Sequence, residues 1–266
     1  MFDSCGRKID YLRISLTEQC NLRCTYCMPA KGATPQPEQQ VLSFAEIVSV
    51  VDAAAGLGIT KVRLTGGEPL MRPGIVELVR LIAAVPGVLT VAMTTNGVLL
   101  AQYAAQLKQA GLDVVNVSMD TLDPLRFRRV TRVGRLQDVI DGILGARAAG
   151  IERIKVNTVV GADSREEDVA AVRSFCDAHG LIHQRIAQFN LKSGKDDDHD
   201  CDRPLRCEEC NRIRMLSTGS LKPCLHSNEE VALDLRNPRD SIRRAVAMKP
   251  ERGAVCTNRS MVAIGG

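Results

Sequence analysis

The chain has no tryptophan, and aromatic residues make up only 3% of its 266 residues. Aliphatic side chains must therefore fill most of its core, in keeping with a hydrophobic content of 45%. A net charge of +4 falls short of the strong basicity of nucleic-acid-binding proteins, so we expect no nucleic acid partner. No apolar run approaches the roughly 18 residues of a membrane span, and no apolar signal region begins the chain. We expect a cytoplasmic protein without a membrane partner.

Cysteine, by contrast, is abundant, with ten residues. The cytosol keeps thiols reduced, so metal ligation explains this number better than disulfides do. Cys20, Cys24 and Cys27 form a C-x3-C-x2-C motif, whose spacing lets one loop hold a 4Fe–4S cluster with one iron left open. A structural zinc site would need a fourth ligand, and no other Cys or His lies near in sequence. With Tyr26 before the last cysteine, the motif resembles that of radical S-adenosylmethionine (SAM) enzymes.

Over the first 190 residues, short β-branched runs alternate with amphipathic stretches. This rhythm predicts an α/β fold, a parallel sheet curled into a partial (β/α)6 barrel of the TIM-like type. The expected strands are 11–16, 61–65, 89–95, 114–119, 153–160 and 184–189, and the expected helices are 44–57, 75–84, 100–110, 136–149 and 165–179. Ser43 and Ser164 are the expected N-caps, and Gly111, Gly150 and Gly180 the expected helix ends. We expect a barrel over residues 1–190 and a C-terminal cluster-binding segment over 191–266, joined by a solvated polar loop at 192–202.

Polar residues fall where the expected strands end, the edge at which parallel α/β barrels gather their functional groups. Gly66 and Gly67 remove side chains where a ligand could approach the backbone. Glu68 offers a carboxylate suited to a ligand ammonium group, with a plain turn as the alternative. Thr95 and Ser118 place hydroxyl groups at neighbouring strand ends, unless they only cap helices.

A second group of cysteines lies near the C-terminus. Its C-x2-C-x13-C pattern comprises Cys207, Cys210 and Cys224. Three thiolates again fall short of a closed zinc site. The residues that could complete such a site are Cys201, His199 and His226. Between the cysteines, Arg212 and Arg214 occupy alternate positions of an extended segment, where two guanidinium groups suit a phosphate or carboxylate.

Segments along nearly the whole chain resemble the molybdenum cofactor biosynthesis protein A family, the radical SAM GTP 3′,8-cyclases. They are residues 11–17, 63–72, 94–97, 115–123, 155–160, 207–214 with Cys224, and 261–266. The resemblance implies a lyase that cleaves SAM reductively to a 5′-deoxyadenosyl radical. That radical takes a ribose hydrogen from GTP and leads to 3′,8-cyclo-7,8-dihydro-GTP.

The resemblance also assigns residues. It implies two 4Fe–4S clusters, the first on Cys20, Cys24 and Cys27 and the second on Cys207, Cys210 and Cys224. For SAM it implies Tyr26, Gly67, Glu68, Thr95 and Ser118. For the GTP triphosphate it implies Arg13, Lys61, Arg63, Arg185, Arg212 and Arg214. It further implies a tail, Gly265-Gly266, that reaches the active site, an electron donor such as flavodoxin or ferredoxin, and a downstream cyclic pyranopterin monophosphate synthase.

Two features depart from the family. Several tens of residues are missing between the sixth strand and the second cysteine group, so the chain is a shortened member. Cys201 or Cys256 could be a fourth ligand of the second cluster, which would leave no iron open to guanine. One alternative is therefore a radical SAM enzyme of the same lineage that modifies a peptide or another nucleotide. A non-catalytic iron–sulfur electron-transfer module is the other.

Overall fold

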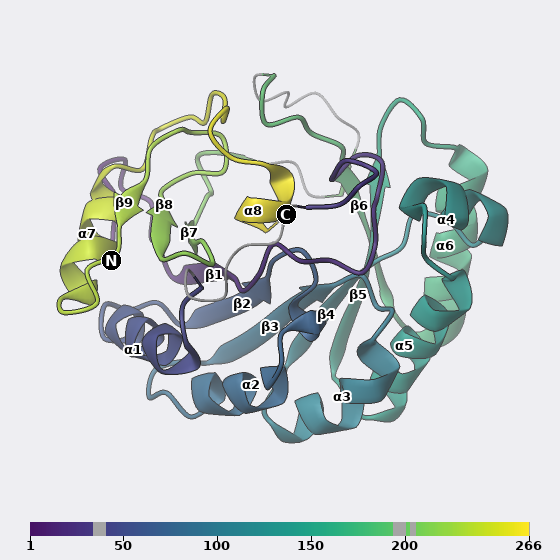
Figure 1. Cartoon of the computed structure of the whole chain (residues 1–266), viewed down its shortest axis with the longest axis horizontal. Helices are drawn as coiled ribbons and strands as arrows, with labels where there is room; N and C mark the ends of the chain where they lie inside the picture. Colours follow the sequence, from purple (N-terminus) through teal and green to yellow (C-terminus); the bar gives the residue numbers. More distant parts are fainter. Residues whose placement is uncertain (34–40, 194–200, 203–205, 266) are drawn as a thin grey trace.

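The computed structural model describes residues 1–33, 41–193, 201–202 and 206–265. One sheet with the strand order β6-β5-β4-β3-β2-β1-β7-β8-β9 runs through this part of the chain. Neighbours from β6 to β7 are parallel, whereas the β7–β8 and β8–β9 pairs are antiparallel. The sheet curves, helices cover its outer face, and β6 and β9 end the strand order without closing it (Figure 1). The predicted open α/β barrel is confirmed.

The elements of the parallel part lie close to their predicted positions. The strands are β1 (Tyr11–Ser15), β2 (Lys61–Thr65), β3 (Thr90–Thr95), β4 (Val114–Ser118), β5 (Arg153–Val160) and β6 (Ile182–Ala187). The predicted helices are α1 (Phe44–Ala55), α2 (Ile75–Ala83), α3 (Leu100–Gln109), α5 (Leu136–Ala148) and α6 (Glu166–His179), with a short 3-10 helix η2 (Pro69–Met71). β6 begins two residues earlier than predicted because it already pairs with β5 at Ile182.

The predicted helix ends are mostly correct. Ser43 caps α1 in a capping box with Glu46, and glycines with positive φ follow α3, α5 and α6 at Gly111, Gly150 and Gly180. The prediction for Ser164 is wrong. Its hydroxyl accepts a hydrogen bond from the Gly161 N–H at 2.9 Å and donates to the Val159 carbonyl at 3.2 Å. Ser164 therefore closes the β5–α6 loop, and the residue at the cap position is Arg165.

Several elements were not predicted. Helix α4 (Pro124–Thr131) begins at an Asp123 cap whose carboxylate accepts from the Leu125 and Arg126 N–H groups. Beyond residue 206 come β7 (Arg212–Met215), β8 (Ser220–Lys222), β9 (Val231–Ala232), α7 (Pro238–Ala247) and α8 (Met261–Ile264). Since β7 pairs with β1, the predicted division at residue 190 falls between strands of one sheet. No helix of the described residues has the length and hydropathy to cross a membrane.

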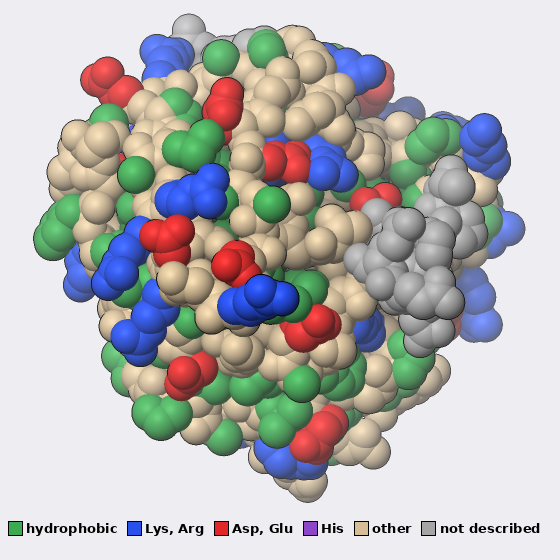
Figure 2. Space-filling view, turned by 60° about the vertical axis from the view of Figure 1, so that its left-hand side comes forward, with side chains coloured by type: hydrophobic (Ala, Val, Ile, Leu, Met, Phe, Trp, Pro, Cys, Tyr) green, Lys and Arg blue, Asp and Glu red, His purple; other side chains and the backbone are tan. Residues whose placement is uncertain are grey.

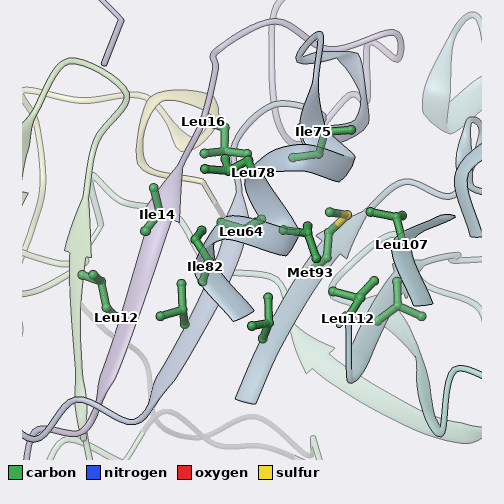
Figure 3. Close-up of a cluster of buried hydrophobic side chains, with 14 of the residues drawn as sticks. Leu12, Ile14, Leu16, Leu64, Ile75, Leu78, Ile82, Met93, Leu107 and Leu112 are labelled. Carbon is green, nitrogen blue, oxygen red and sulfur yellow. The ribbon is translucent and has the colours of Figure 1, made fainter. Parts of the chain in front are cut away.

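The outer face of the sheet forms the core with the helices. Leu12 and Ile14 of β1 and Leu64 of β2 alternate with polar residues and pack toward Leu78 and Ile82 of α2 (Figure 3). All five are at most 1% exposed, and burying one such side chain contributes about 1.5–3 kcal/mol. The aliphatic core expected from the composition is present, which leaves the inner, concave face of the sheet free for polar groups.

Candidate functional site

The first cysteine triplet occupies the loop that follows β1. The Cys27 and Met28 N–H groups donate to the Cys24 carbonyl at 3.0 and 3.1 Å, which makes residues 24–28 a helical turn. Cys20 is held by the Leu22 N–H at 3.4 Å and by Asn96 Nδ2, at the end of β3, at 3.6 Å from its Sγ. The loop is thus tied both to itself and to the mouth of the barrel.

The electrostatics of this triplet fit a metal centre. Burial, together with the neighbouring thiols, raises the pKa of Cys24 and of Cys27 to about 12, and burial raises the pKa of Cys20. Three half-buried thiols this close together are stable as thiolates only beside positive charge, which an iron–sulfur cluster supplies. In the described part of the chain no group of three His, Cys, Asp or Glu residues is arranged to hold a single metal ion. It is the C-x3-C-x2-C spacing on one short loop that suits this triplet to a cluster.

Gly66 and Gly67, which follow β2, pack against the segment that leads into the first cysteine loop. A Cβ at Gly66 would lie 2.6 Å from the Thr17 carbonyl oxygen, and one at Gly67 would lie 2.3 Å from that of Gln19. The Gly67 and Glu68 N–H groups donate to these two carbonyls at 2.7 and 2.8 Å. The close approach that we expected of a ligand is made here by the chain's own backbone, just before Cys20.

Glu68 is fully buried, with its carboxylate already hydrogen-bonded. It accepts from Thr95 Oγ1 at 2.8 Å, the Asn96 N–H at 2.7 Å and the Leu70 N–H at 3.0 Å. Burial raises the pKa of Glu68 to about 7 in spite of these donors. Glu68 thus joins the β2 end to the β3 end and fixes Thr95 and Asn96 beside the cysteine loop.

Tyr26 and Ser118 lie farther along the same rim. The Tyr26 hydroxyl donates to Asp120 Oδ2 at 2.9 Å, and Asp120 Oδ1 accepts from the Val159 N–H at 2.8 Å. A cavity of about 580 Å³ opens beside Tyr26 and Asp120, lined also by α4 and α6. Ser118 ends β4, in register with the buried Asn157 of β5. The structure brings these predicted residues to one rim, and their role in SAM binding stays a prediction.

Five of the six predicted triphosphate residues lie together on the inner face. Parallel pairing puts Arg63, Arg13 and Arg214 in one row across β2, β1 and β7. A second row holds Lys61, Tyr11 and Arg212. Neighbouring strands are about 4.8 Å apart, so these side chains are adjacent.

The two rows form a buried concentration of positive charge. Burial and the surrounding arginines lower the pKa of Arg13 well below its usual value, and burial and Arg212 lower that of Arg214 to about 10. Burial alone would raise the pKa of Tyr11, but Arg13, Arg63 and Lys61 lower it to about 8. The Tyr11 hydroxyl accepts from Arg63 Nε at 2.5 Å. An anion bound here would relieve repulsion among the cations.

Arg185 lies elsewhere. It pairs in register with Thr158 of β5, on the face opposite to Asn157, and β6 is at the far end of the strand order. Its side chain donates to Asp202 Oδ1 from Nε at 3.2 Å and from Nη2 at 3.0 Å, and its N–H donates to Asp202 Oδ2 at 2.8 Å. The structure does not bring Arg185 to the other five. Lys155, in register with Asn116, does share their inner face, and strand alternation from Asn157 could have found it.

The second triplet lines one pocket next to these rows. Cys207, Cys210 and Cys224 surround it together with Arg212, Arg214 and Lys249. A Cβ at Gly253 would come within 3.0 Å of Cys224 Sγ, so only glycine leaves this sulfur clear. Burial would raise the pKa of Cys210, yet Lys249 and Arg212 lower it to about 7. Three thiols in a cationic pocket suit a second cluster.

Buried cations that the sequence did not reveal hold the backbone around this pocket. Arg7, paired with Asp3 at 2.6 Å, donates to the Cys207 carbonyl at 2.8 Å. Lys249, 3% exposed, donates to the Arg212 and Pro223 carbonyls at 2.8 and 2.9 Å. Lys222, fully buried, donates to the Ser227 carbonyl at 2.6 Å. Each fixes a residue within three positions of a cysteine of the triplet.

The candidate fourth ligands have different surroundings. Cys256 is fully buried beside Leu191 and Leu225, and its Sγ donates to Asn258 at 3.3 Å. Cys201 adjoins Asp202 at the β6 edge and is not among the residues that line the pocket. His226 lines the pocket, and His199, like residues 194–200 of the predicted loop, lies outside the described residues. Ligation by Cys201 stays a prediction.

The C-terminal tail reaches the concave face. Helix α8 lies in the mouth of the barrel (Figure 1), and the Gly265 carbonyl accepts from Arg13 Nη2 at 3.4 Å. A Cβ at Gly265 would lie 2.3 Å from Thr65 Oγ1, so this position requires glycine. Gly266 lies outside the described residues.

Comparisons with known proteins agree with this geometry. A model of the radical SAM superfamily matches residues 14–176. The GTP 3′,8-cyclase of Alkaliphilus oremlandii is 37% identical over 320 aligned residues that cover both chains completely, and that of Heliobacterium modesticaldum is 39% identical over 90% of this chain and 86% of its own. The first alignment exceeds 266 residues, so this relative carries segments that the chain lacks.

Among solved structures, native anSMEcpe with bound AdoMet superposes with a TM-score of 0.65 at 15% identity, covering 91% of this chain and 81% of its own. This likeness shows the shared fold. The identity to the curated cyclases extends over the second cysteine triplet as well as the barrel. The chain therefore belongs to the radical SAM superfamily and, within it, to the family of the GTP 3′,8-cyclases.

Proposed function

We propose that this protein is a radical SAM lyase that converts GTP to 3′,8-cyclo-7,8-dihydro-GTP in molybdenum cofactor biosynthesis. The observation that carries the proposal is the pair of cation rows on the concave face, between the two cysteine triplets. A triphosphate is the small-molecule group that best matches several arginines and a lysine in one buried patch. The outer surface offers no comparable patch in the view of Figure 2, where acidic and basic side chains are intermingled.

Cys20, Cys24 and Cys27 would hold the first cluster, which with SAM would supply a carbon-centred radical able to take a hydrogen atom from substrate. The chain's own residues fix where this happens. Glu68 holds the β2 and β3 ends together, and Tyr26, Gly67, Thr95 and Ser118 line the rim on which we place SAM. The cavity of about 580 Å³ next to Tyr26 lies toward α4 and α6, and of the residues that we assign to SAM only Tyr26 lines it.

The cation rows bind and orient the triphosphate. Arg63 is 4% exposed, and its Nη1 is fixed by the Met93 carbonyl at 2.9 Å and Thr94 Oγ1 at 3.1 Å. A side chain held in this way loses little freedom when it binds an anion, so it positions the nucleotide accurately. Cys207, Cys210 and Cys224 would hold the second cluster in the pocket that they share with Arg212 and Arg214, where an open iron would offer a site for the guanine base.

One observation favours a second candidate, a radical SAM enzyme of the same lineage with another substrate, a peptide or a different nucleotide. Arg185 is tied to Asp202 instead of joining the cation rows. If Cys201, next to Asp202, closed the second cluster, no iron would be open to guanine.

A flavodoxin or ferredoxin as electron donor and a cyclic pyranopterin monophosphate synthase downstream complete the first proposal.

Anaerobic incubation of the reconstituted protein with SAM, a reductant and GTP tests the proposal. We expect 5′-deoxyadenosine and a cyclised GTP product in equal amounts. SAM cleavage with unchanged GTP would favour the second candidate, and absence of SAM cleavage would overturn both. Arg63→Gln should slow cyclisation about tenfold or more at low GTP, whereas Arg80→Gln, which changes an exposed arginine of α2, should match the wild type.

A further inference from the structure

Helix α4 is the element that supports the first cysteine loop. Its last carbonyl groups have no partner within the helix, as at any helix C-terminus. Two of them accept from the loop: the Val130 carbonyl from the Thr25 N–H at 3.0 Å, and the Thr131 carbonyl from the Arg23 N–H at 3.1 Å. The loop therefore continues the hydrogen bonding of α4, and its position depends on how α4 ends.

At that end stands Arg132, whose backbone is strained. Its φ is 65° and its ψ −37°, and it is the one residue other than glycine with positive φ in the described chain. A side chain in such a conformation costs about 1–3 kcal/mol and persists where the surroundings impose it. Nothing about the end of α4 requires an arginine here, because a glycine would end the helix without strain.

The side chain explains why arginine is present. Arg132 Nη1 donates to the Arg23 carbonyl at 2.8 Å and to the Met28 carbonyl at 3.0 Å. These two residues stand directly before Cys24 and directly after Cys27. One guanidinium nitrogen thus joins the two ends of the turn that carries both cysteines.

The packing around Arg132 also ties the end of α4 to the cysteine loop. Leu22, 4% exposed, reaches from the loop to the corner after α4, where a Cβ at Gly134 would lie 2.8 Å from Leu22 Cδ2 and 2.8 Å from Phe127 Cε1. Thr131 closes the same corner, accepting from the Gly134 N–H at 3.1 Å. The corner is packed too tightly to turn differently, which holds Arg132 in its strained conformation.

We propose that Arg132 is a positioning residue for the first cluster, whose guanidinium clamps the turn of residues 24–27 so that the Cys24 and Cys27 thiolates keep the spacing that a cluster needs. This inference rests on the proposed function, because it takes Cys20, Cys24 and Cys27 as the cluster ligands. Arg132 does not touch the cluster, SAM or substrate. It acts through the Arg23 and Met28 carbonyls.

Two substitutions separate the clamp from the strain. Arg132→Gly removes the clamp and relieves the strain, so we expect a melting temperature at or above that of the wild type. Arg132→Ala removes the clamp and keeps the strain, so its melting temperature should be lower. Arg128→Ala is the matched control, since Arg128, one turn earlier on α4, donates to the Val133 carbonyl at 2.8 Å and not to the loop.

The measurement is the loss of the SAM-responsive EPR signal of the reduced, reconstituted protein during exposure to an iron chelator. Only a cluster with an iron open to SAM gives this signal, so it reports the first cluster alone. Loss of the clamp should accelerate signal loss about tenfold in both Arg132 variants, as expected for two hydrogen bonds of ordinary strength. Arg128→Ala should behave as the wild type does.

The outcomes distinguish the two proposals. Absence of a SAM-responsive signal in the wild type would overturn the proposed function, and this inference with it. If the wild type gives the signal and Arg132→Gly loses it no faster than the wild type does, only the clamp is overturned. The clamp is also overturned if the rate of signal loss simply tracks the melting temperature across all three variants, because a general structural role predicts that result.

Discussion

The two cysteine triplets differ in what surrounds them. Around the first, the backbone is held by carbonyl groups of α4 and by the guanidinium groups of Arg23 and Arg132, while the charged groups that act on its thiols include the carboxylates of Glu68 and Asp120. Around the second, the backbone is held by buried cations, Arg7, Lys222 and Lys249, and the cation rows begin beside it. The thiol pKa values follow the difference, about 12 for Cys24 against about 7 for Cys210. Under the proposed function, a site for SAM, whose net charge is about +1, needs no added positive charge, whereas a site beside a triphosphate benefits from it.

The largest effect should come from breaking each triplet in turn. Cys24→Ser removes a proposed ligand of the first cluster, so SAM cleavage should fall to background. Cys210→Ser should leave SAM cleavage measurable and abolish formation of cyclised GTP, because the radical is still made but guanine is no longer held. Product analysis by mass spectrometry checks both, with exposed Cys5→Ser as the control. Equal loss of SAM cleavage in the two variants would contradict a division of labour between the triplets.

Next in size is removal of a buried cation at the second triplet. Lys249→Met removes the Lys249 donor from the Arg212 and Pro223 carbonyls, at about 1–3 kcal/mol each, so the free energy of unfolding should fall by about 2–6 kcal/mol. The second cluster should also be lost, seen as fewer iron atoms per chain. Lys108→Met, which breaks an exposed ion pair with Glu152, should cost about 1 kcal/mol or less. Chemical denaturation of both variants measures the contrast, and similar losses would mean that Lys249 contributes no more than a surface lysine.

This comparison also separates what the sequence predicts from what it leaves hidden. Cysteine spacing, the βα rhythm and the alternation of Arg212 with Arg214 are local patterns, and the structure agrees with them. Once the strand order is known, parallel pairing places Arg13, Arg63 and Arg214 in one row.

The features that the sequence did not predict depend on contacts between segments that are distant along the chain. Helix α4 buries only Phe127 and Thr131 and is short and rich in arginine, so its sequence offers too few apolar residues to predict a helix. Lys249 reads as a surface lysine until the fold brings the Arg212 and Pro223 carbonyls around it. Arg185 is paired by Asp202, a contact that only the return of the chain to β6 creates. Buried charge is set by such tertiary contacts and not by local sequence.

Tyr11 gives a smaller effect that reports the charge near the second triplet. Its pKa of about 8 in the folded protein is below the value of about 10 for an unfolded chain. A depressed acid pKa adds stability as pH rises through that interval, so the wild type should gain up to about 2–3 kcal/mol between about pH 8 and pH 10 relative to Tyr11→Phe. Unfolding free energies measured across this interval check the gain. Tyr103→Phe, on α3, should retain it, and parallel curves for wild type and Tyr11→Phe would mean that the cation rows do not act on this hydroxyl.

The smallest effect, on the KM for GTP, is expected at Arg185. This cation lies outside the cation rows and is compared with Arg63, which lies within them. Arg63→Gln removes a charged donor to the triphosphate, a contact of about 1.5–3 kcal/mol, so the KM for GTP should rise about tenfold or more while the rate of SAM cleavage without GTP stays unchanged. Arg185→Gln breaks a partly exposed pair with Asp202, worth about 0–1 kcal/mol, so the KM should change less than about fivefold. Steady-state kinetics on both variants decide between the two positions. Equal increases in KM would place Arg185 at the triphosphate, and the pair with Asp202 would then have to open for substrate to bind.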